Sequence, residues 1–328
     1  MSKTAFVTGA SGFVGLNLVE ELLAQGWQVT ALHRATSDLR RLERLPVRRV
    51  IGDVTDFKSL LRAMPRETGA VFHVAGNTTL WSRGRIEQLR VNVRGTRNMV
   101  RAALETGARR FVHTSSIVAY GLRGGVITED TPPAGINAPI NYVRSKALAE
   151  REVRRGLSRG LPAVIVNPAH IMGPYDEDNW SRLFRLIDRR RLPAVPGGGG
   201  SFCHVRAVAR AHIAAAERGR IGANYLLGGA DSTYLSLAQE IARLLGRRGR
   251  FARLPVPVMK AYARVEEWIA PLFGREPEVT REAVDLLSTT LYCSSRRAME
   301  ELGYQPLPLS RLLEDCHRWM RESGLLRA

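Results

Sequence analysis

The sequence predicts an α/β protein: a Rossmann-type, doubly wound parallel sheet with a smaller, mostly helical C-terminal lobe. Three observations predict it. A glycine-rich turn joins a short apolar run to a helical segment near the N-terminus, β-rich runs alternate with helices through the first half, and this alternation loosens after Pro168. Strands separated by helices imply right-handed crossovers and therefore a parallel sheet. We expect a Rossmann domain at residues 1–170, with return elements near 200–230, and an interleaved substrate lobe at 171–328.

The individual elements follow from the apolar pattern. Short β-rich runs predict strands at residues 4–8, 28–32, 49–51, 70–74, 111–114, 163–166 and 224–227. Helical spacing predicts helices at 13–25, 56–64, 92–106 and 142–155. Gly26 and Gly107 stand where glycine commonly ends a helix.

The composition excludes several classes of protein. The 328 residues are 45% apolar and 24% charged, which is typical of a globular core and excludes a disordered or fibrous chain. The formal charge is +18, but the basic residues are spread along the chain, so a nucleic-acid partner is not favoured. Three distant cysteines favour a reducing compartment. With no signal-peptide pattern and no spanning apolar stretch, we expect a soluble, cytoplasmic protein without a metal centre.

The first turn has the pattern of a phosphate cradle. It reads Gly-x-x-Gly-x-x-Gly, not the commoner Gly-x-Gly-x-x-Gly, and lies between the first strand and the first helix. Glycines there let backbone N–H groups approach a pyrophosphate at the positive end of the helix. A tight turn without a ligand is the alternative. The expected cofactor contacts in this turn are Gly9, Ser11, Gly12, Phe13, Val14 and Gly15.

The end of the second strand indicates which dinucleotide binds. An acidic residue there binds the ribose 2′-OH of NAD, whereas arginine accommodates the 2′-phosphate of NADP. The strand ends without a carboxylate, and Arg34 takes that place with Arg41 nearby, whereas Asp38 lies too far into the loop. NADP(H) is therefore favoured over NAD(H). Asp53 and Val54, which close the third strand, are expected against the adenine.

Tyr142 and Lys146 have the spacing of a proton-transfer pair. Four residues apart, they lie on one face of a predicted helix, and a nearby cation lowers the pKa of a phenol from about 10. Ser115 and Ser116 end a strand and would donate to a carbonyl oxygen as negative charge develops on it. The alternative is that the two residues lie on a solvated helix face and have this spacing by chance.

Together these segments resemble the extended short-chain dehydrogenase/reductase family over nearly the whole chain. The residues that carry the resemblance are 8–15, 52–53, 73–76, 92–96, 114–116, 142–146 and 167–169. The resemblance is closest to dihydroflavonol-4-reductase-like, 3β-hydroxysteroid-dehydrogenase-like and hopanoid-associated epimerase-like members. It implies a catalytic triad of Ser116, Tyr142 and Lys146. Further cofactor contacts are then expected at Val74, Ala75, Gly76, Asn92, Thr114, Tyr142, Lys146, Pro168 and Ile171.

Two departures from the family pattern bear on function. Ala207 replaces an acidic residue that helps to join the lobe to the core. Ser201 and Phe202 stand where nucleotide-sugar epimerases tend to place a diphosphate-binding arginine, which lowers the weight of that alternative.

Aromatic and aliphatic groups dominate the loops beyond the strand ends, which favours an apolar or ring-shaped substrate. The candidate substrate contacts are Thr78, Trp81, Ser116, Tyr120, His170, Tyr175 and Trp180. For any one of them, packing of the lobe is the alternative. His170 would be a second acid or, more commonly for a lone histidine, a structural residue.

The apolar stripe at residues 259–273 has two interpretations. It is either docked against the sheet lobe, which we favour because Glu266 and Glu267 dilute its basic face, or an interfacial helix in weak contact with anionic lipid. The predicted helices at 92–106 and 142–155 would form the homodimer face common in the family.

These observations predict an NADP(H)-dependent oxidoreductase that interconverts a secondary alcohol and a ketone. Its substrate would be hydrophobic: sterol-, terpenoid- or flavonoid-like. The first alternative is a nucleotide-sugar epimerase or dehydratase with tightly held NAD. The second is a non-catalytic nucleotide- or RNA-binding protein on the same fold.

Overall fold

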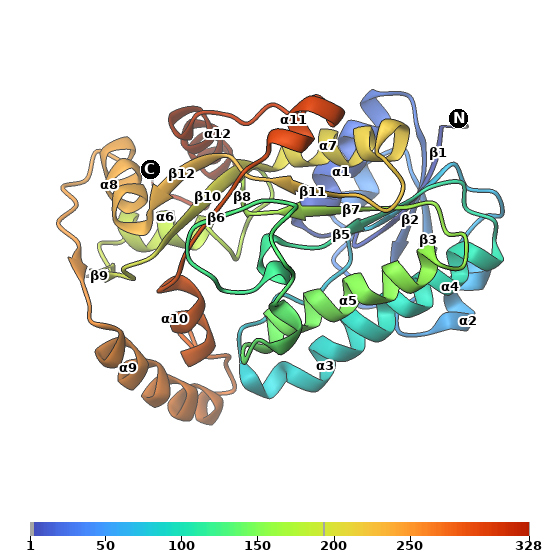
Figure 1. Cartoon of the computed structure of the whole chain (residues 1–328). Helices are drawn as coiled ribbons and strands as arrows, with labels where there is room; N and C mark the ends of the chain where they lie inside the picture. The colour runs from blue at the N-terminus through green and yellow to red at the C-terminus, as the bar shows by residue number, and fades with distance from the viewer. Residues whose placement is uncertain (1–2, 193, 328) are drawn as a thin grey trace.

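Seven parallel strands form the central sheet of the computed structural model, which describes residues 3–192 and 194–327 (Figure 1). Their order across the sheet is β11-β7-β5-β4-β1-β2-β3. The bounds are β1 Thr4–Thr8, β2 Gln28–His33, β3 Arg48–Ile51, β4 Ala70–His73, β5 Phe111–Thr114, β7 Ala163–Pro168 and β11 Asn224–Leu227. Each strand predicted from the sequence is present, and the doubly wound parallel sheet is confirmed.

Helices cover both faces of this sheet. In Figure 1, α1 (Phe13–Ala24), α7 (Val205–Arg218) and α11 (Arg296–Leu302) lie above it, and α2 (Phe57–Ala63), α3 (Arg85–Leu89), α4 (Thr96–Glu105) and α5 (Asn141–Leu157) lie below. Strand β1 shows why the sheet needs both layers: Val7 packs into the upper core and Phe6 into the lower one, and both are fully buried. A π-helical segment, Arg90–Gly95, joins α3 to α4, so the helix predicted to begin at residue 92 begins at 85.

A second sheet, which the sequence pattern does not predict, joins strands of the C-terminal lobe to β6 and β8 from earlier in the chain. Its strands follow the order β12-β10-β14-β6, and β8 pairs with β10. They are β6 Val126–Ile127, β8 His170–Met172, β10 Gly199–His204, β12 Ala230–Thr233 and β14 Thr290–Cys293. Around them lie α6 Ser181–Asp188, α8 Tyr234–Leu244, α9 Val256–Ile269, α10 Arg281–Leu287 and α12 Leu309–Glu322. A short pair, β9 Ala194–Val195 with β13 Ala252–Arg253, completes the lobe.

The favoured interpretation of the apolar stripe at residues 259–273 is wrong. The buried residues of α9 are Ala263, Glu266 and Glu267, whereas the large apolar side chains of the stripe face outward. Ion pairs to neighbouring arginines satisfy both glutamates, which explains how a helix can turn its charged side inward. None of the helices among the described residues is long and apolar enough to cross a bilayer.

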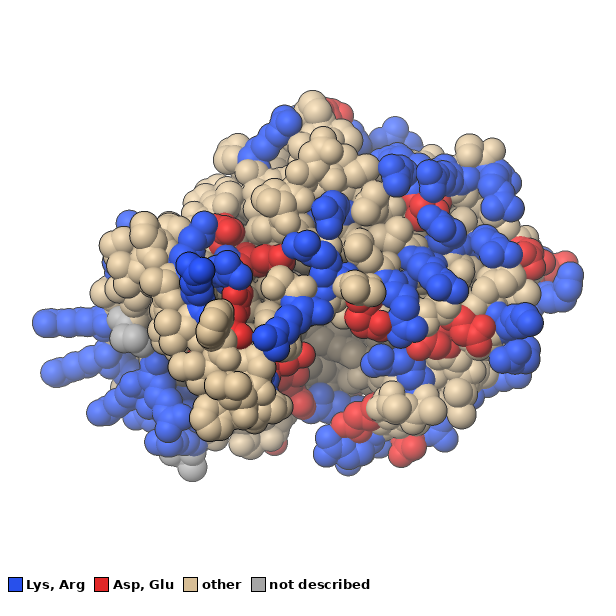
Figure 2. Space-filling model, turned by 90° about the horizontal axis from the view of Figure 1, so that it is seen from below, with Lys and Arg blue, Asp and Glu red and all other residues tan. Residues whose placement is uncertain are grey.

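The surface is strongly basic, as the composition requires. Seen from below, Figure 2 shows lysine and arginine side chains spread over both lobes and a hollow in the surface between them. Many arginines form ion pairs with nearby carboxylates, including Arg97 with Glu152 and Arg220 with Glu301. Pairs with both partners exposed contribute little to stability.

Candidate active site

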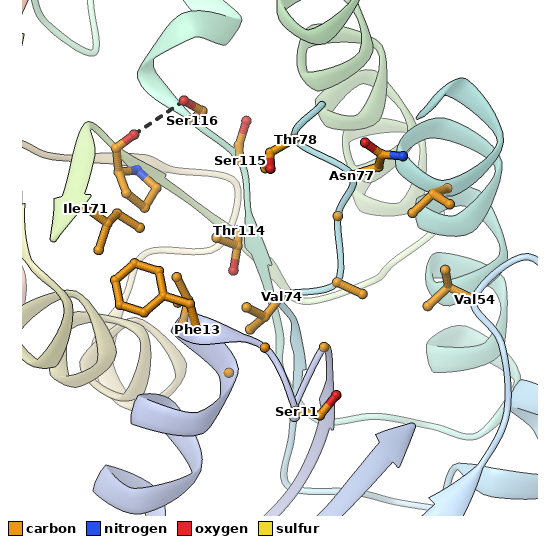
Figure 3. A pocket seen from close by; sticks show the side chains of 18 of the residues that line it. Ser11, Phe13, Val54, Val74, Asn77, Thr78, Thr114, Ser115, Ser116 and Ile171 are labelled. Atoms are coloured by element: carbon orange, nitrogen blue, oxygen red, sulfur yellow. Dashed lines mark hydrogen bonds between the residues drawn. The ribbon is translucent and has the colours of Figure 1, made fainter. Parts of the chain in front are cut away.

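A pocket of about 700 Å³ opens at the carboxyl ends of the central strands (Figure 3). Its wall runs from the turn after β1, past the ends of β2 to β5 and β7, to the segment that leads into α6. We call the end at residues 9–15 the glycine end, and the end lined by His170, Asn179 and Trp180 the aromatic end. In parallel α/β sheets, ligands bind at this edge.

The glycine end is shaped by close backbone contacts. Gly9 has φ +69°, and a Cβ there would lie 2.8 Å from the backbone N of Ala75. A Cβ on Gly15 would lie 2.0 Å from the Gly9 carbonyl oxygen, so α1 can approach the turn only without a side chain. Gly12 differs, because a Cβ there meets no protein atom closer than 3.4 Å. Its small size therefore leaves space in the pocket rather than permitting a contact within the protein.

The start of α1 fits a dinucleotide phosphate. Gly12 is the N-cap residue, and no side chain caps the helix, so the positive end of α1 lies at the pocket wall. Figure 3 shows Ser11 in this turn, and the Phe13 ring near Val74 and Ile171. An open cradle at an uncapped helix start suits the pyrophosphate of a nicotinamide dinucleotide.

A buried histidine ties this turn to its neighbours. The ring of His73 is hydrogen-bonded on one side to the Thr8 hydroxyl (2.9 Å) and on the other to the Thr96 hydroxyl (3.0 Å). The Thr8 hydroxyl also accepts the N–H of Ala75 (3.1 Å). Burial lowers the pKa of His73 to about 3, with a smaller contribution from Lys146, so the ring is neutral at physiological pH.

The end of β2 presents a cation to the pocket. Arg34 lies in the wall beside Ser37, whose hydroxyl accepts the Arg34 N–H at 3.0 Å. Asp38 points to Arg40, which donates to both of its oxygens and holds its pKa down at about 2. Arg41 lies outside the wall: it pairs with Glu177 and its guanidinium stacks on Tyr175, 5.1 Å from the ring centroid.

Ser116, Tyr142 and Lys146 all line the wall. Ser116 follows β5, and its hydroxyl donates to the Pro168 carbonyl at 3.4 Å (Figure 3). Burial raises the pKa of Tyr142, opposed by a hydrogen bond with Ser116. The spacing of Tyr142 and Lys146 predicts that the lysine lowers the phenol pKa, whereas the Lys146 ammonium donates to the Thr114 carbonyl at 3.0 Å. Burial lowers the pKa of Lys146 to about 8.

A buried carboxylate lies one helical turn beyond Lys146. Glu150 accepts hydrogen bonds from Ser115 (2.6 Å), Asn167 (2.6 Å) and Asn224 (3.2 Å), which come from three neighbouring strands or strand ends. Its negative charge raises the pKa of Lys146 against the effect of burial. Glu150 therefore helps to keep the lysine charged beside the pocket.

The aromatic end is a cluster of rings. His170 and Trp180 line the pocket, and Phe202 and Tyr234 pack behind them, with Trp180 stacked on Tyr234 at 5.5 Å between centroids. Burial lowers the pKa of His170 to about 4, and its Nε2 is hydrogen-bonded to the Tyr234 hydroxyl at 3.1 Å. A Cβ on Gly200 would lie 2.3 Å from the His170 ring, so this glycine makes room for the histidine.

Most residues singled out in the sequence lie in this wall. They are Gly9, Ser11, Gly12, Phe13, Val14, Gly15, Arg34, Asp53, Val54, Val74, Ala75, Gly76, Thr78, Thr114, Ser116, Tyr142, Lys146, Pro168, His170, Ile171 and Trp180. Asn92 lies behind it, where its side-chain amide bonds the backbone of Asn77 and the hydroxyl of Ser145. Four others, Arg41, Trp81, Tyr120 and Tyr175, are not among the lining residues.

Each of the four has a physical reason to lie elsewhere. Tyr175 donates to Glu20 on α1 and stacks under Arg41. Tyr120 is buried in the core that packs around Ile140 and Val143. The Arg83 guanidinium lies 5.6 Å from the ring centroid of Trp81.

Some lining residues were not anticipated, among them His33, Ser37, Glu87 and Val91. Glu87 and Val91 were missed because the predicted helix began at residue 92, which left them in a loop. The run from residue 85 onward has helical spacing and would have revealed them.

Known proteins match both the chain and the fold. A model of the NAD dependent epimerase/dehydratase family matches residues 5–228, more than half of the chain. The chain belongs to this family. Family members named reductases and dehydrogenases match over nearly the full length, so the chain is an NAD(P)-dependent enzyme of the extended short-chain dehydrogenase/reductase type, and its cofactor is a nicotinamide dinucleotide.

Three relatives of this family show how far the likeness extends. A putative dihydroflavonol 4-reductase of Synechocystis sp. is 33% identical, covering 100% of this chain and 97% of its own. Sterol demethylase protein B of Methylococcus capsulatus is 32% identical, with 98% and 100% covered. The solved structure of gox2253 is 34% identical and superposes with a TM-score of 0.86, covering 99% of this chain and 100% of that one.

Proposed function

We propose that the protein is an NADP(H)-dependent ketone reductase, or in reverse an alcohol dehydrogenase, for a hydrophobic ring-shaped substrate. The observation that carries the proposal is that Ser116, Tyr142 and Lys146 share one pocket wall with an uncapped glycine turn. A hydroxyl, a phenol and an ammonium at the strand ends form the donor set that a carbonyl oxygen needs as it becomes an alkoxide.

Tyr142 is the proposed proton donor. Its raised pKa keeps the phenol protonated at neutral pH, the form needed for reduction. A bound reduced nicotinamide supplies a hydride to the carbonyl carbon. Ser116 donates a hydrogen bond to the carbonyl oxygen, and the Tyr142 proton moves to that oxygen, leaving a phenolate near Lys146. In the alcohol-to-ketone direction the phenolate takes the proton back.

Lys146 has two proposed roles. Its positive charge lies one helical turn from Tyr142 and stabilises the phenolate electrostatically. Its ammonium, anchored on the Thr114 carbonyl, is also close to Gly76, where a Cβ would lie 3.4 Å from Nζ. The Gly76 surface therefore leaves room for a cofactor ribose hydroxyl to reach the ammonium.

The preference for NADP(H) rests on Arg34. It is exposed at the pocket wall after β2, while the nearest acid in that loop, Asp38, is held by Arg40 outside the wall. Glu87 also lies in the wall, but Arg90 donates to both of its oxygens (2.7 and 2.9 Å). A cation at this position suits a 2′-phosphate better than a 2′-hydroxyl.

The substrate class rests on the aromatic end. Trp180 and a neutral His170 offer flat, largely apolar surfaces, with Phe202 and Tyr234 behind them. The names of the two curated relatives, which mention a dihydroflavonol and a sterol, point the same way. Phe202 stands where an epimerase tends to carry a diphosphate-binding arginine, which disfavours a nucleotide-sugar.

The test is a pair of titrations followed by turnover. NADPH and NADH are titrated by fluorescence into the purified protein and into Arg34→Asp, with Arg40→Ala as the matched control from the same loop. We expect tighter NADPH binding, and a loss of roughly tenfold to a hundredfold in Arg34→Asp alone. Oxidation of NADPH is then followed with an oxosteroid and with dihydroquercetin, and turnover of one of these ketones is expected.

Two outcomes would overturn the proposal. One is a protein that binds neither added reduced cofactor yet releases oxidised NAD on denaturation, which indicates an epimerase or dehydratase. The other is equal affinity of the wild type for both cofactors, unchanged in Arg34→Asp, which removes the role of Arg34.

A further inference from the structure

The apolar side chains on the surface are concentrated in one segment. Among the described residues, fourteen large apolar side chains are exposed, and nine of them lie between residues 254 and 273. Those nine are Leu254, Val256, Val258, Tyr262, Val265, Trp268, Ile269, Leu272 and Phe273. Trp268, Leu272 and Phe273 are 77%, 81% and 75% exposed. We call these nine residues the α9 face. Contiguous exposed apolar surface of this kind marks an interaction site.

Ion pairs on the inner side of α9 hold this face outward. Glu267 accepts both the backbone N–H and the Nε–H of Arg281 on α10, at 2.9 and 2.8 Å. Glu266 pairs with Arg275, and Lys260 with Asp285 at 2.6 Å. Turning the helix over would bury the apolar residues but leave these charges without their partners. The ion pairs of the lobe therefore fix the orientation of α9 with its apolar side exposed.

The surface around the α9 face is basic. From residue 245 to 265 the chain contains five arginines and one lysine but no acidic residue. Pairing of β9 with β13 brings the exposed Arg189, Arg190 and Arg191 into the same region as Arg250 and Arg253. None of these five forms an ion pair with a carboxylate within residues 3–192 and 194–327. Figure 2 shows basic side chains gathered at the left end of the molecule beside uncharged surface.

The α9 face is also connected to the pocket. The Thr280 hydroxyl at the start of α10 donates to the Leu80 carbonyl at 2.7 Å, and Glu282 pairs with Arg85 at 3.7 Å. The strand-end loop that contains Leu80 also supplies Asn77 and Thr78 to the pocket wall. The α9–α10 pair thus abuts a loop of the pocket, and Figure 2 shows the hollow beside this part of the lobe.

We propose that the α9 face docks on an anionic phospholipid bilayer, with its aromatic and aliphatic side chains in the interface and the flanking arginines on the lipid phosphates. Apolar side chains bordered by basic ones are the pattern of an interfacial helix. A second copy of the chain fits less well, because it would bring two arginine clusters together. Given the proposed function, docking would also present the pocket to a substrate dissolved in the lipid.

The experiment is co-sedimentation of the full chain with vesicles of phosphatidylcholine alone or mixed with phosphatidylglycerol. We expect binding to the anionic vesicles that weakens with salt. Trp268→Ser/Leu272→Ser/Phe273→Ser should lose roughly a thousandfold in affinity, since each large apolar side chain contributes about tenfold. Ile86→Ser, which removes an isolated side chain that is 82% exposed, should bind like the wild type.

A second variant tests the charges and guards against misfolding of the first. Arg248→Glu/Arg250→Glu/Arg253→Glu should weaken anionic binding by about fivefold or more for each arginine. Both variants should keep the NADPH affinity of the wild type, which separates this proposal from the proposed function. The docking proposal fails if the wild type does not bind anionic vesicles, or if both variants bind them normally. It also fails if the serine variant abolishes a concentration-dependent dimer while the wild type ignores vesicles, since the occupant is then a second copy.

Discussion

The glycine end of the pocket is built by neighbouring βα units, whereas the aromatic end is assembled from segments far apart in the chain. At the glycine end, Gly9, Gly12 and Gly15 belong to one turn and one helix start, and His73 joins that turn to the next strand in the sheet. At the aromatic end, His170 and Trp180 rest on Phe202 and Tyr234, which belong to β10 and α8 of the second sheet layer.

The difference lies in what holds each end in place. Backbone contacts and a positive φ hold the glycine end, so few residue types are tolerated there and the ligand sees mostly N–H groups. Side-chain packing holds the aromatic end, so its shape can change with single substitutions. We therefore expect changes at the first end to affect cofactor binding and folding, and changes at the second to affect the substrate. Variants can test that division.

The largest expected effect is at the junction of the two ends. Tyr142→Phe removes the proposed proton donor and keeps the ring, so kcat should fall roughly 10²–10⁴-fold with NADPH affinity within about twofold of wild type. Tyr120→Phe is the matched control, because Tyr120 is a buried tyrosine outside the pocket wall. Steady-state kinetics and a fluorescence titration measure both. Equal kcat in Tyr142→Phe and the wild type would remove Tyr142 from the chemistry.

The same division explains which parts were predictable from sequence. The seven central strands, the glycine turn and the pairing of Tyr142 with Lys146 follow from local patterns: a period, a turn, an i,i+4 spacing. The choice of Ser116 over Ser115 came from the family resemblance. The second sheet does not, because β6, β8 and β14 are two to four residues long and pair across large sequence separations. Phe202 and Tyr234 were thus not connected with His170.

Two other expectations differ from the structure, and both differences have identifiable causes. Arg41 was expected near a 2′-phosphate by its distance along the chain, but Glu177 and Tyr175, more than 130 residues away, determine its position. The apolar stripe on α9 was expected to dock against the sheet lobe because Glu266 and Glu267 dilute its basic face, but these two glutamates are among the buried residues of the helix. Spacing shows which side chains share a face, but not whether that face meets protein.

The second-largest effect concerns the glycine end. The Cβ of Gly12→Ala would lie no closer than 3.4 Å to any protein atom, so the variant should fold normally. Because the new methyl group enters the phosphate cradle, NADPH binding should weaken by at least about tenfold. Gly15→Ala differs, because its Cβ would collide with the Gly9 carbonyl oxygen, and we expect about 1–3 kcal/mol of destabilisation. Thermal melts with and without NADPH distinguish the two. A Gly12→Ala protein with normal affinity would contradict the cradle.

At the aromatic end a smaller effect is expected. Trp180→Leu keeps an apolar side chain but removes a flat surface of the pocket, so KM for a ring-shaped ketone should rise roughly tenfold, with NADPH affinity unchanged. Trp319→Leu is the matched control, since Trp319 packs against Tyr175 outside the pocket wall. If Trp180→Leu weakened NADPH binding and spared KM, the two ends would not be functionally separate.

The smallest effect is a displacement along the pH axis. Lys146 has a pKa of about 8, lowered by burial and supported by the charge of Glu150, which sits one helical turn away. Glu150→Gln removes that charge and keeps most of the shape, so the ammonium should lose its proton at lower pH. Activity that needs charged Lys146 is present below this pKa and lost above it. The alkaline limb of kcat/KM should therefore move down by roughly one pH unit.

The control is Glu152→Gln. Glu152 is a buried carboxylate on the same helix that pairs with Arg97, so its substitution should leave the alkaline limb in place. If Glu150→Gln lowers activity equally at every pH, Glu150 only supports the fold and does not determine the protonation of Lys146.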